Sequence, residues 1–414
     1  MTARKARGRA NGEGSIFAYR TGFAAYVVVS LPNGGRKRKY VYGQNREDVH
    51  RRWVALSHEA QRGTVVFSAP TVAQLVHTWL AQDVRPNLSP ATVDRYGMFV
   101  RLHIVPALGV KRVDRLTVRD VQSWVNGLRE ECQCCAQGKD SVRAVPRCCA
   151  AGACCGQVLS ARTVKDARDV LRAALGSALR EELVTRNVAT LVRLPAARRR
   201  RSGAWSVTEA RTFLESARAD EDPYYVGYVL VLGLRRGEVL GLGWDDVDLD
   251  AGQVRVEWQV QRIAGELMRR ETKTSTSDAT LPLPAICVAA LRRSSGVREE
   301  WRSVAGAAWD DHWITGGLVL TTRYGGAVEP RNFYRSFQSR CRAAGVRPVT
   351  VHSTRHTCAS LLAALDVHPR VAMQILRHSQ IAVTMNVYTE TYSKDTTEAL
   401  RRLGEEFDGG AVAS

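Results

Sequence analysis

The stretch VHSTRHTCASLLAALDVHPRVAMQILRHSQIAVTMNVY, residues 351–388, decides the fold of the last part of the chain. Its apolar residues recur at helical spacing. Pro369 follows a break at residues 366–368, and proline is well suited to the first turn of a new helix. The stretch therefore predicts a series of short helices rather than one long helix.

Four polar residues of this stretch fall at the predicted helix ends. His352 and Arg355 precede the first helix, His378 ends the second, and Tyr388 follows a third short amphipathic segment. Each of these side chains can bind or attack a phosphate. The predicted helices would bring all four onto one compact scaffold.

The whole chain is strongly basic. Its 414 residues include 60 Lys and Arg against 41 Asp and Glu, a formal net charge of +19. Such an excess indicates a polyanionic partner, most often nucleic acid, since phosphate neutralisation releases counterions. The alternative, a basic protein from an arginine-rich proteome, is disfavoured because the charges cluster.

Targeting signals are not evident in the sequence. The basic residues 4–9 are followed by no apolar run of the kind a signal peptide has. No apolar stretch approaches the roughly 20 residues that a membrane helix needs. We expect a cytoplasmic protein with no membrane partner.

Residues 1–65 predict a small α+β domain. Residues 16–19, 23–30 and 37–42 are β-prone, residues 32–35 read as a hairpin turn, and residues 46–61 are expected to be helical. One strand carries a basic run, which could lie in a DNA major groove: Arg36, Lys37, Arg38 and Lys39. The alternative is a solvated basic edge that prevents strand aggregation.

Residues 70–195 predict a helical domain. Ser89, Thr117 and Ser160 are placed to cap helices, and Pro90 follows Ser89 at a first helical position. Arg and Lys look scattered over these helices rather than paired with acids one turn away, which suits a DNA-facing surface. An ordinary helical packing unit is the structural alternative, and both can hold.

Residues 132–155 form an insertion that lacks apolar periodicity. Clustered thiols in a reducing compartment suggest a structural zinc site, although C-x-C-C and C-C pairs replace the usual C-x-x-C of a zinc ribbon. The alternative is a disordered or redox-labile loop. The thiols are Cys132, Cys134, Cys135, Cys148, Cys149, Cys154 and Cys155.

Residues 196–204 read as a basic linker, since proline stops the preceding helix and an arginine run cannot fold compactly. The run could track a phosphate backbone or act as a solvated tether, and it contains Arg198, Arg199, Arg200 and Arg201. A last domain is expected at 205–414. It opens with a capping box of Ser206 and Glu209, and it closes with a separate helix at 394–407.

Cleavage of a DNA phosphodiester without a metal would need three kinds of group. Two guanidiniums would stabilise the charged oxygens, an acid would protonate the departing 5′-oxygen, and a hydroxyl would attack. A tyrosine can supply that hydroxyl when a base or cationic field activates it. The chain offers Arg235, Lys273, His352, Arg355, His378 and Tyr388 for these tasks.

At this point the sequence resembles the tyrosine recombinases of the phage-integrase family over nearly its whole length. Residues 233–238, Gly-Leu-Arg-Arg-Gly-Glu, resemble the first arginine motif, which implies that Arg235 clamps the phosphate and that Glu238 supports it. The resemblance makes Lys273, in a hairpin, the general acid.

Three further motifs lie within residues 351–388. His352 and Arg355 fit the H-x-x-R signature, and Leu-Arg-His-Ser at 376–379 resembles the family's L-G-H-S around His378. Tyr388 fits the nucleophile motif and is preferred to Tyr392 by its spacing from His378. The order and spacing of all these motifs carry the resemblance.

The family implies a multidomain fold, mainly α with small β-sheets: an arm-type DNA-binding domain, a helical core-type domain and a mostly helical catalytic domain. It implies a nucleoid-associated integrase that integrates or excises a mobile element through a 3′-phosphotyrosyl link. Its partners would be attachment-site DNA, three further protomers and an excisionase or other directionality factor. No cofactor is required. A type IB-like topoisomerase and an inactive DNA-binding regulator are the alternatives.

Three positions depart from the family pattern. Arg377 stands where glycine is usual, Thr354 where leucine is usual, and Gly243 where arginine is common. Glycine at the first position would allow a positive φ that arginine disfavours by roughly 1–2 kcal/mol.

Overall fold

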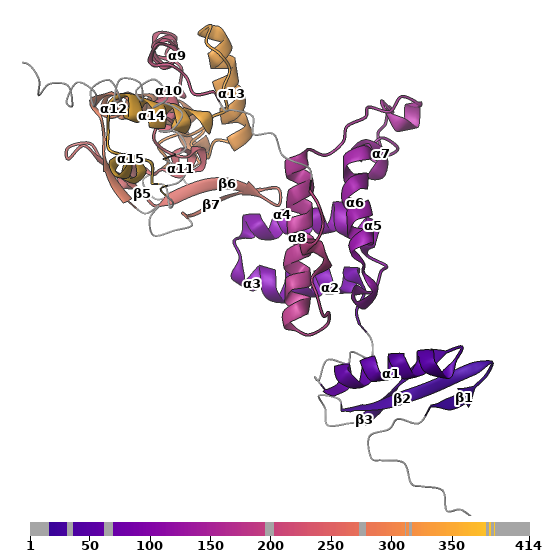
Figure 1. The fold of residues 1–414 in the computed structure, drawn as a ribbon. Helices are drawn as coiled ribbons and strands as arrows, with labels where there is room; N and C mark the ends of the chain where they lie inside the picture. Colours follow the sequence, from indigo (N-terminus) through magenta and orange to yellow (C-terminus); the bar gives the residue numbers. More distant parts are fainter. Residues whose placement is uncertain are drawn as a thin grey trace, which may run out of the picture. The chain divides into compact units, whose positions relative to one another are not determined.

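The structure is a computed structural model that describes residues 16–30, 36–61, 69–194, 203–272, 279–310, 312–313, 317–377, 381 and 385. The chain divides into two compact units, Met1–Arg198 and Arg199–Ser414 (Figure 1). Each unit is mostly helical with small sheets, which confirms the predicted fold class.

The first unit begins with a three-stranded antiparallel sheet, β1 (Phe17–Tyr19), β2 (Gly22–Ser30) and β3 (Arg36–Gly43), in the order β1-β2-β3. Helix α1 (Arg46–Gln61) covers one face, where Val29 of the sheet and Leu56 of the helix are buried together. The strands and helix lie within a residue or two of the predicted ranges, because alternation and turn residues mark them clearly. The predicted hairpin turn at 32–35 lies outside the described residues.

The rest of this unit is a helical bundle whose apolar core is centred on α8, the longest of its helices. Thr117 and Ser160 accept hydrogen bonds from backbone N–H groups of the following turns, as predicted. Ser89 instead bonds the Thr92 hydroxyl at 2.9 Å. The helices are α2 (Val72–Trp79), α3 (Arg85–Asn87), α4 (Pro90–Phe99), α5 (Val105–Leu108), α6 (Val118–Glu130), α7 (Gln133–Ala136) and α8 (Ala161–Arg180).

Two π-helical turns in this bundle each connect one helix to the next just before a proline. Leu80–Val84 joins α2 to α3 just before Pro86, and Val100–Ile104 joins α4 to α5 just before Pro106. Proline lacks an N–H and its ring clashes with a carbonyl of the preceding turn in a regular helix. The wider turn accommodates both problems, so the helical chain that begins at Pro90 continues to Leu108.

The prediction that Arg and Lys of the bundle are not paired with acids one turn away is wrong for α8. Arg162 bonds Asp166 at 3.1 Å and Lys165 bonds Asp169 at 2.5 Å, and both pairs are spaced i,i+4. These side chains neutralise one another on the helix surface. The surface of α8 is therefore a mixed-charge surface rather than a bare basic one.

The second unit combines helices with two small sheets of strand orders β4-β5-β8 and β6-β7. The strands are β4 (Val247–Asp248), β5 (Gln253–Val256), β6 (Trp258–Ile263), β7 (Glu266–Glu271) and β8 (Ala279–Pro282). The helices are α9 (Val207–Ala219), α10 (Tyr225–Leu230), α11 (Arg236–Gly241), α12 (Ala285–Ala305), α13 (Pro330–Ala343), α14 (Ser353–Ala364) and α15 (Pro369–Leu376).

An aromatic core fixes the helices of this unit. Phe213 of α9 lies 5.3 Å from Tyr228 of α10 and 5.1 Å from Phe337 of α13, measured between ring centroids. Trp205 stacks on the same Phe337 and donates its indole N–H to the Arg347 carbonyl. Because α10 lies within this core, the point at which the chain leaves the core is fixed. The start of α11, a few residues further on, is therefore fixed as well.

Helix α11 packs unusually close to strand β6. A Cβ atom built at Gly241 would lie 2.6 Å from the Cα of Gln259, so only glycine permits this approach.

No helix in the described part of the chain is long and apolar enough to cross a membrane.

Candidate active site

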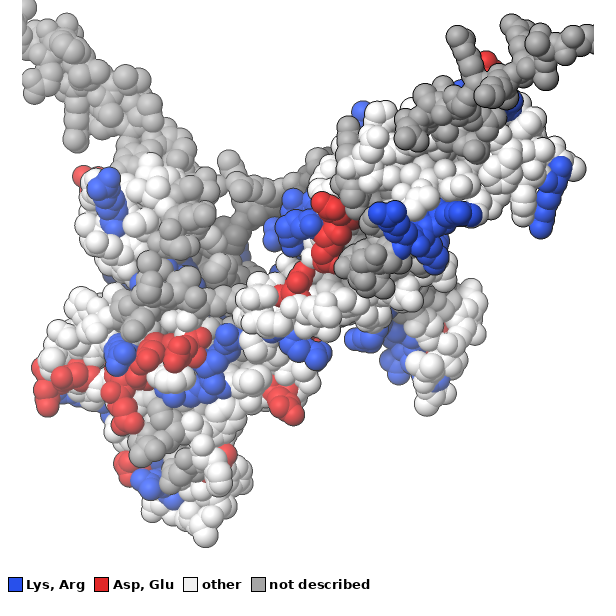
Figure 2. Space-filling model, turned by 90° about the horizontal axis from the view of Figure 1, so that it is seen from below, with Lys and Arg blue, Asp and Glu red and all other residues white. Residues whose placement is uncertain are grey.

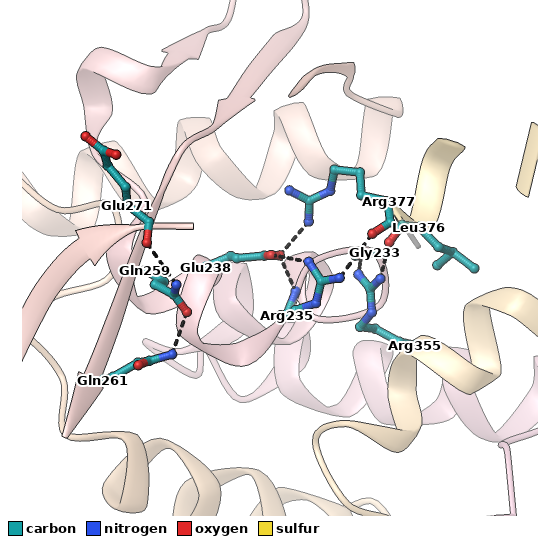
Figure 3. Close-up of polar contacts among 9 residues, drawn as sticks. All are labelled: Gly233, Arg235, Glu238, Gln259, Gln261, Glu271, Arg355, Leu376 and Arg377. Carbon is teal, nitrogen blue, oxygen red and sulfur yellow. Dashed lines mark hydrogen bonds and ion pairs between the residues drawn. The ribbon is translucent and has the colours of Figure 1, made fainter. Parts of the chain in front are cut away.

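Arg235 and Glu238 form the first part of the site, at the start of α11. The Glu238 carboxylate accepts a hydrogen bond from the Arg235 backbone N–H at 2.7 Å and one from its guanidinium Nη1 at 2.7 Å. Glu238 is buried, whereas the Arg235 side chain is 39% exposed. Figure 3 shows this carboxylate orienting the guanidinium, and the exposure of the Arg235 side chain keeps it accessible to solvent.

Arg355 lies in the first turn of α14, and His352 is the N-cap residue of that helix. The helix begins earlier than predicted, so Arg355 does not precede it. The buried Arg355 guanidinium donates to the carbonyls of Gly233 and Leu376. It therefore joins the chain entering α11 to the end of α15 (Figure 3).

Thr354 gives α14 a second link to the same region. Its buried hydroxyl lies 2.6 Å from the Val231 carbonyl oxygen and 2.7 Å from that of Val351. A hydroxyl has one proton to donate, so the two carbonyls share it. A leucine at this position would leave Val231 without that partner.

Arg377 ends α15 in the left-handed conformation, with φ 49° and ψ 50°. This is the backbone geometry for which glycine is usual. Its carbonyl oxygen accepts a hydrogen bond from Arg235 Nη2 at 3.0 Å. Its guanidinium bonds the second oxygen of Glu238 at 2.5 Å, and both of these side chains are almost fully buried.

The guanidiniums of Arg235 and Arg377 thus share the Glu238 carboxylate, and the Arg355 guanidinium lies close enough to both to feel their charges. Burial acts to raise the pKa of Glu238, but Arg377 and Arg235 outweigh it and hold that pKa below its ordinary value. Burial, reinforced by Arg235, lowers the pKa of Arg355 to about 10. With three arginines beside one glutamate, the described part of the cluster has an excess of basic side chains, which suits an anion.

His352 lies beside this cluster. Its ring packs edge-on against the ring of His356, with centroids 5.4 Å apart. Desolvation lowers the pKa of His352, and the nearby His356, Arg355 and Arg235 lower it further. The imidazole is therefore neutral at pH 7 and has one N–H to donate.

Strand β7 approaches the site from the other side of α11. Gln259 donates its side-chain amide to the Glu271 carbonyl at 3.0 Å, and Gln261 donates to Gln259 at 2.6 Å (Figure 3). These bonds fix the end of β7, two residues before Lys273. Lys273, His378 and Tyr388 lie outside the described residues, as do Arg198, Arg199, Arg200 and Arg201.

Sequence reasoning missed three contributors to the site. Arg377 stands out in the sequence only as a departure from glycine, and its bond to Glu238 spans 139 positions. The carbonyls of Gly233 and Leu376 serve as anchors for Arg355, and main-chain acceptors leave no signal in the residue type. A basic residue directly before His378 was the only available hint.

The basic strand β3 divides its side chains between two faces. Val29 faces α1 and pairs with Lys37, so Lys37 and Lys39 lie on the helix side of the sheet. Arg36 and Arg38 lie on the open face, where Arg38 stacks over Tyr26 with 4.7 Å from its guanidinium carbon to the ring centroid. The four basic residues of β3 are therefore divided between the two faces of the sheet.

The open face of the sheet also carries tyrosines. The rings of Tyr40 and Tyr42 lie 6.2 Å apart, and both side chains are substantially exposed. Figure 2 shows Lys and Arg side chains in several separate clusters, with Asp and Glu between some of them. A face that combines arginine with exposed aromatic rings is a candidate surface for nucleic acid.

Two family models match the chain. The phage integrase family matches residues 209–395, and the phage integrase N-terminal SAM-like domain matches residues 71–129. The first includes Arg235, Arg355 and Tyr388. The second spans α2 to α6 of the helical bundle and stops one residue before the end of α6.

Relatives match along most of the chain. A tyrosine recombinase XerC-like protein of Caldanaerobacter subterraneus subsp. tengcongensis is 24% identical over 392 residues, covering 91% of this chain and 93% of that protein. An integrase of Streptomyces ambofaciens is 27% identical over 373 residues, covering 86% of each.

Solved structures show the same fold. The Tn1549 transposon integrase, in complex with a circular intermediate DNA, superposes with a TM-score of 0.64 at 20% identity, covering 81% of this chain and all of that one. A lambda integrase dimer bound to a core site gives 0.52 at 15% identity, covering 77% and 95%. With two domain models and relatives along nearly its full length, the chain belongs to the phage integrase family of tyrosine recombinases.

Proposed function

We propose that this site-specific recombinase cleaves DNA by attack of the Tyr388 hydroxyl on a backbone phosphate. The tyrosine hydroxyl gives up its proton to water as its oxygen forms a bond to phosphorus, and the bond to the 5′-oxygen breaks, leaving a 3′-phosphotyrosyl link and a free 5′-hydroxyl. Lys273 supplies the proton that the departing oxygen takes. Attack of another strand's 5′-hydroxyl reverses the step and rejoins the DNA. The bond energy is retained in the link, so no nucleotide cofactor is consumed.

The observation that carries this proposal is the placement of Arg235 and Arg355. Backbone carbonyls and the Glu238 carboxylate hold both guanidiniums before any substrate arrives. Charge develops on the non-bridging oxygens in the transition state, and preorganised donors stabilise it most effectively. His352 would donate its remaining N–H to the same phosphate. The chain passes from Arg377 straight into His378, which we place beside these groups.

We also propose how the chain engages its DNA. The open sheet face of the first unit would contact an arm-type site, and the helical bundle and the second unit would contact the core site. The arginines of the linker would follow the phosphate backbone between them. Exchange of strands between two duplexes would require four protomers, with the predicted C-terminal helix at 394–407 docking on a neighbour. An excisionase or similar factor would set direction, and the reaction would take place on DNA in the cytoplasm.

A nicked suicide substrate containing the attachment site tests the nucleophile. Cleavage close to the nick releases a short fragment, so the covalent intermediate cannot be resealed. We expect the wild-type chain to form an SDS-stable adduct with the DNA, and Tyr388→Phe to form none while still binding the duplex. Phenylalanine removes only the attacking oxygen.

Tyr392→Phe is the matched control, because this tyrosine lies four positions further along the chain. It should form the adduct at the wild-type level. Peptide mapping of the adduct should place the nucleotide on residue 388. An adduct that survives Tyr388→Phe and is lost in Tyr392→Phe would overturn the assignment. Relaxation of supercoiled plasmid without recombined product would instead favour a topoisomerase.

A further inference from the structure

The cysteine-rich insertion of the helical bundle folds around sulfur. Cys132 and Cys148 are buried, at 8% and 2% exposure, and form a small cluster with Cys134, separate from the main apolar core of the bundle. Val142 and Val145 of the same insertion are 85% and 66% exposed. The insertion therefore has no aliphatic core that would explain its fold.

Four sulfur atoms of the insertion have the arrangement of a metal site. The Sγ atoms of Cys132, Cys135, Cys148 and Cys154 all lie within 4.8 Å of one another. A tetrahedral zinc with bonds of about 2.3 Å holds its sulfurs about 3.8 Å apart. Cys135 and Cys154 are 3.6 Å apart, close to that value and far from the roughly 2.0 Å of a disulfide.

The main chain around these sulfurs is built to present them. The fully buried Asp140 carboxylate accepts hydrogen bonds from the backbone N–H groups of Arg147, Cys148 and Ala150, at 2.9, 2.8 and 3.1 Å. The loop that carries Cys148 is thereby fixed. The backbone N–H of Cys155 donates to Cys148 Sγ at 2.9 Å, a contact that supports a thiolate ligand.

We propose that Cys132, Cys135, Cys148 and Cys154 bind a structural zinc ion. Four thiolates around one point make a closed site, which leaves no position for substrate and so serves stability. Cys132 and Cys135 supply a C-x-x-C pair at the start of α7. Cys148 comes from the loop held by Asp140, and Cys154 from the returning chain. The ion therefore joins three segments of the insertion.

A second set of sulfurs adjoins the first. Cys134, Cys148 and Cys149 also lie within 4.8 Å of one another, so Cys148 belongs to both sets. A thiolate can bridge two zinc ions, as its sulfur has more than one lone pair. The proposal requires the zinc ion bound by Cys132, Cys135, Cys148 and Cys154. It allows a second zinc ion bound by Cys134, Cys148 and Cys149.

Metal analysis of the purified full-length chain tests the site. We expect about one zinc per chain, or about two if the second set fills, and ligand thiols, those of Cys132, Cys135, Cys148 and Cys154, that react with an alkylating reagent only after denaturation with a chelator. The double variant Cys135→Ser/Cys154→Ser should lose at least one zinc per chain. Cys287→Ser, a partly buried cysteine of the second unit, should retain the wild-type content.

Cobalt substitution gives a readout that does not depend on any variant. The cobalt-loaded wild-type chain should show the intense visible bands of a tetrahedral site together with thiolate charge-transfer absorption. Limited proteolysis should cut within residues 136–153 after chelation, while the helical bundle stays intact. A metal-free chain with a protected insertion would overturn the proposal. So would bound iron, or disulfides joining Cys132 to Cys155 and Cys135 to Cys154.

Discussion

Two regions of this molecule use arginine in opposite ways. In the second unit, Arg355 and Arg377 are buried, and carbonyls or the Glu238 carboxylate hold their guanidiniums. On the N-terminal sheet, Arg36 and Arg38 are exposed, with Arg38 stacked over Tyr26. The first arrangement fixes direction, and the second offers charge with freedom to move.

The difference separates two tasks in handling one polyanion. A guanidinium fixed before the substrate arrives loses little entropy in the transition state and can accelerate chemistry. An exposed guanidinium attracts many phosphates about equally, and salt screens it. We therefore expect changes in the first region to alter reaction rate or folding, and changes in the second to alter the salt dependence of binding.

The largest effect is expected from Arg355→Lys. A lysine keeps the charge but cannot donate to both the Gly233 and Leu376 carbonyls while also facing a phosphate. The rate of adduct formation on the suicide substrate should fall by about 10²–10³-fold, with little change in equilibrium DNA binding. Arg335→Lys, at an exposed arginine of α13, is the control and should react at the wild-type rate. Equal rates for both variants would mean that the fork geometry of Arg355 is unimportant.

A smaller effect, on stability, is expected at Arg377. Arg377→Ala leaves a buried carboxylate short of one partner and should lower the free energy of unfolding by about 3 kcal/mol or more. Arg377→Gly loses the same ion pair but relieves the left-handed backbone, so it should be about 1 kcal/mol more stable than the alanine variant. Hydrogen exchange of α11 peptides in denaturant measures both changes. Identical values for alanine and glycine would show that the backbone conformation costs nothing here.

The smallest effect is expected from Arg38→Ala on the open sheet face. Binding to DNA that carries an arm-type site should weaken slightly, and the slope of log K against log salt should flatten by about one unit. Fluorescence anisotropy at several salt concentrations measures that slope. Arg51→Ala removes an exposed arginine from α1, on the opposite side of the sheet, and should leave the slope unchanged. A flatter slope in Arg51→Ala alone would place the DNA against the helix instead.

Much of the fold could be predicted because its signals are local. The strands of the N-terminal sheet follow alternation and turn residues, and Ser206 with Glu209 forms the predicted capping box. Pro369 begins α15 as expected. The residues that resemble the family motifs include Arg235 and Arg355, and the structure brings these two together.

The remainder depends on contacts that no local pattern records. The bond between Arg377 and Glu238 joins positions 139 residues apart, and Thr354 reaches a carbonyl 123 positions away. The spacing of the cysteines along the sequence also did not show which of them would lie together. The run C-x-C-C contains a C-x-x-C pair, Cys132 and Cys135, and only the fold shows that these two sulfurs share a set.

The hydrogen bonds that Arg235 and Arg355 make to the end of α15 have a consequence for how this protein can vary over evolution. Arg235 and Arg355 hold the carbonyls of Arg377 and Leu376, and a carbonyl is the same whatever side chain its residue carries. Position 377 can therefore exchange glycine for arginine without releasing the anchor, provided that the new side chain finds an acid such as Glu238. Related chains with a large residue here should carry a compensating change nearby. A motif search that demands glycine before the histidine would overlook members that keep the same anchor.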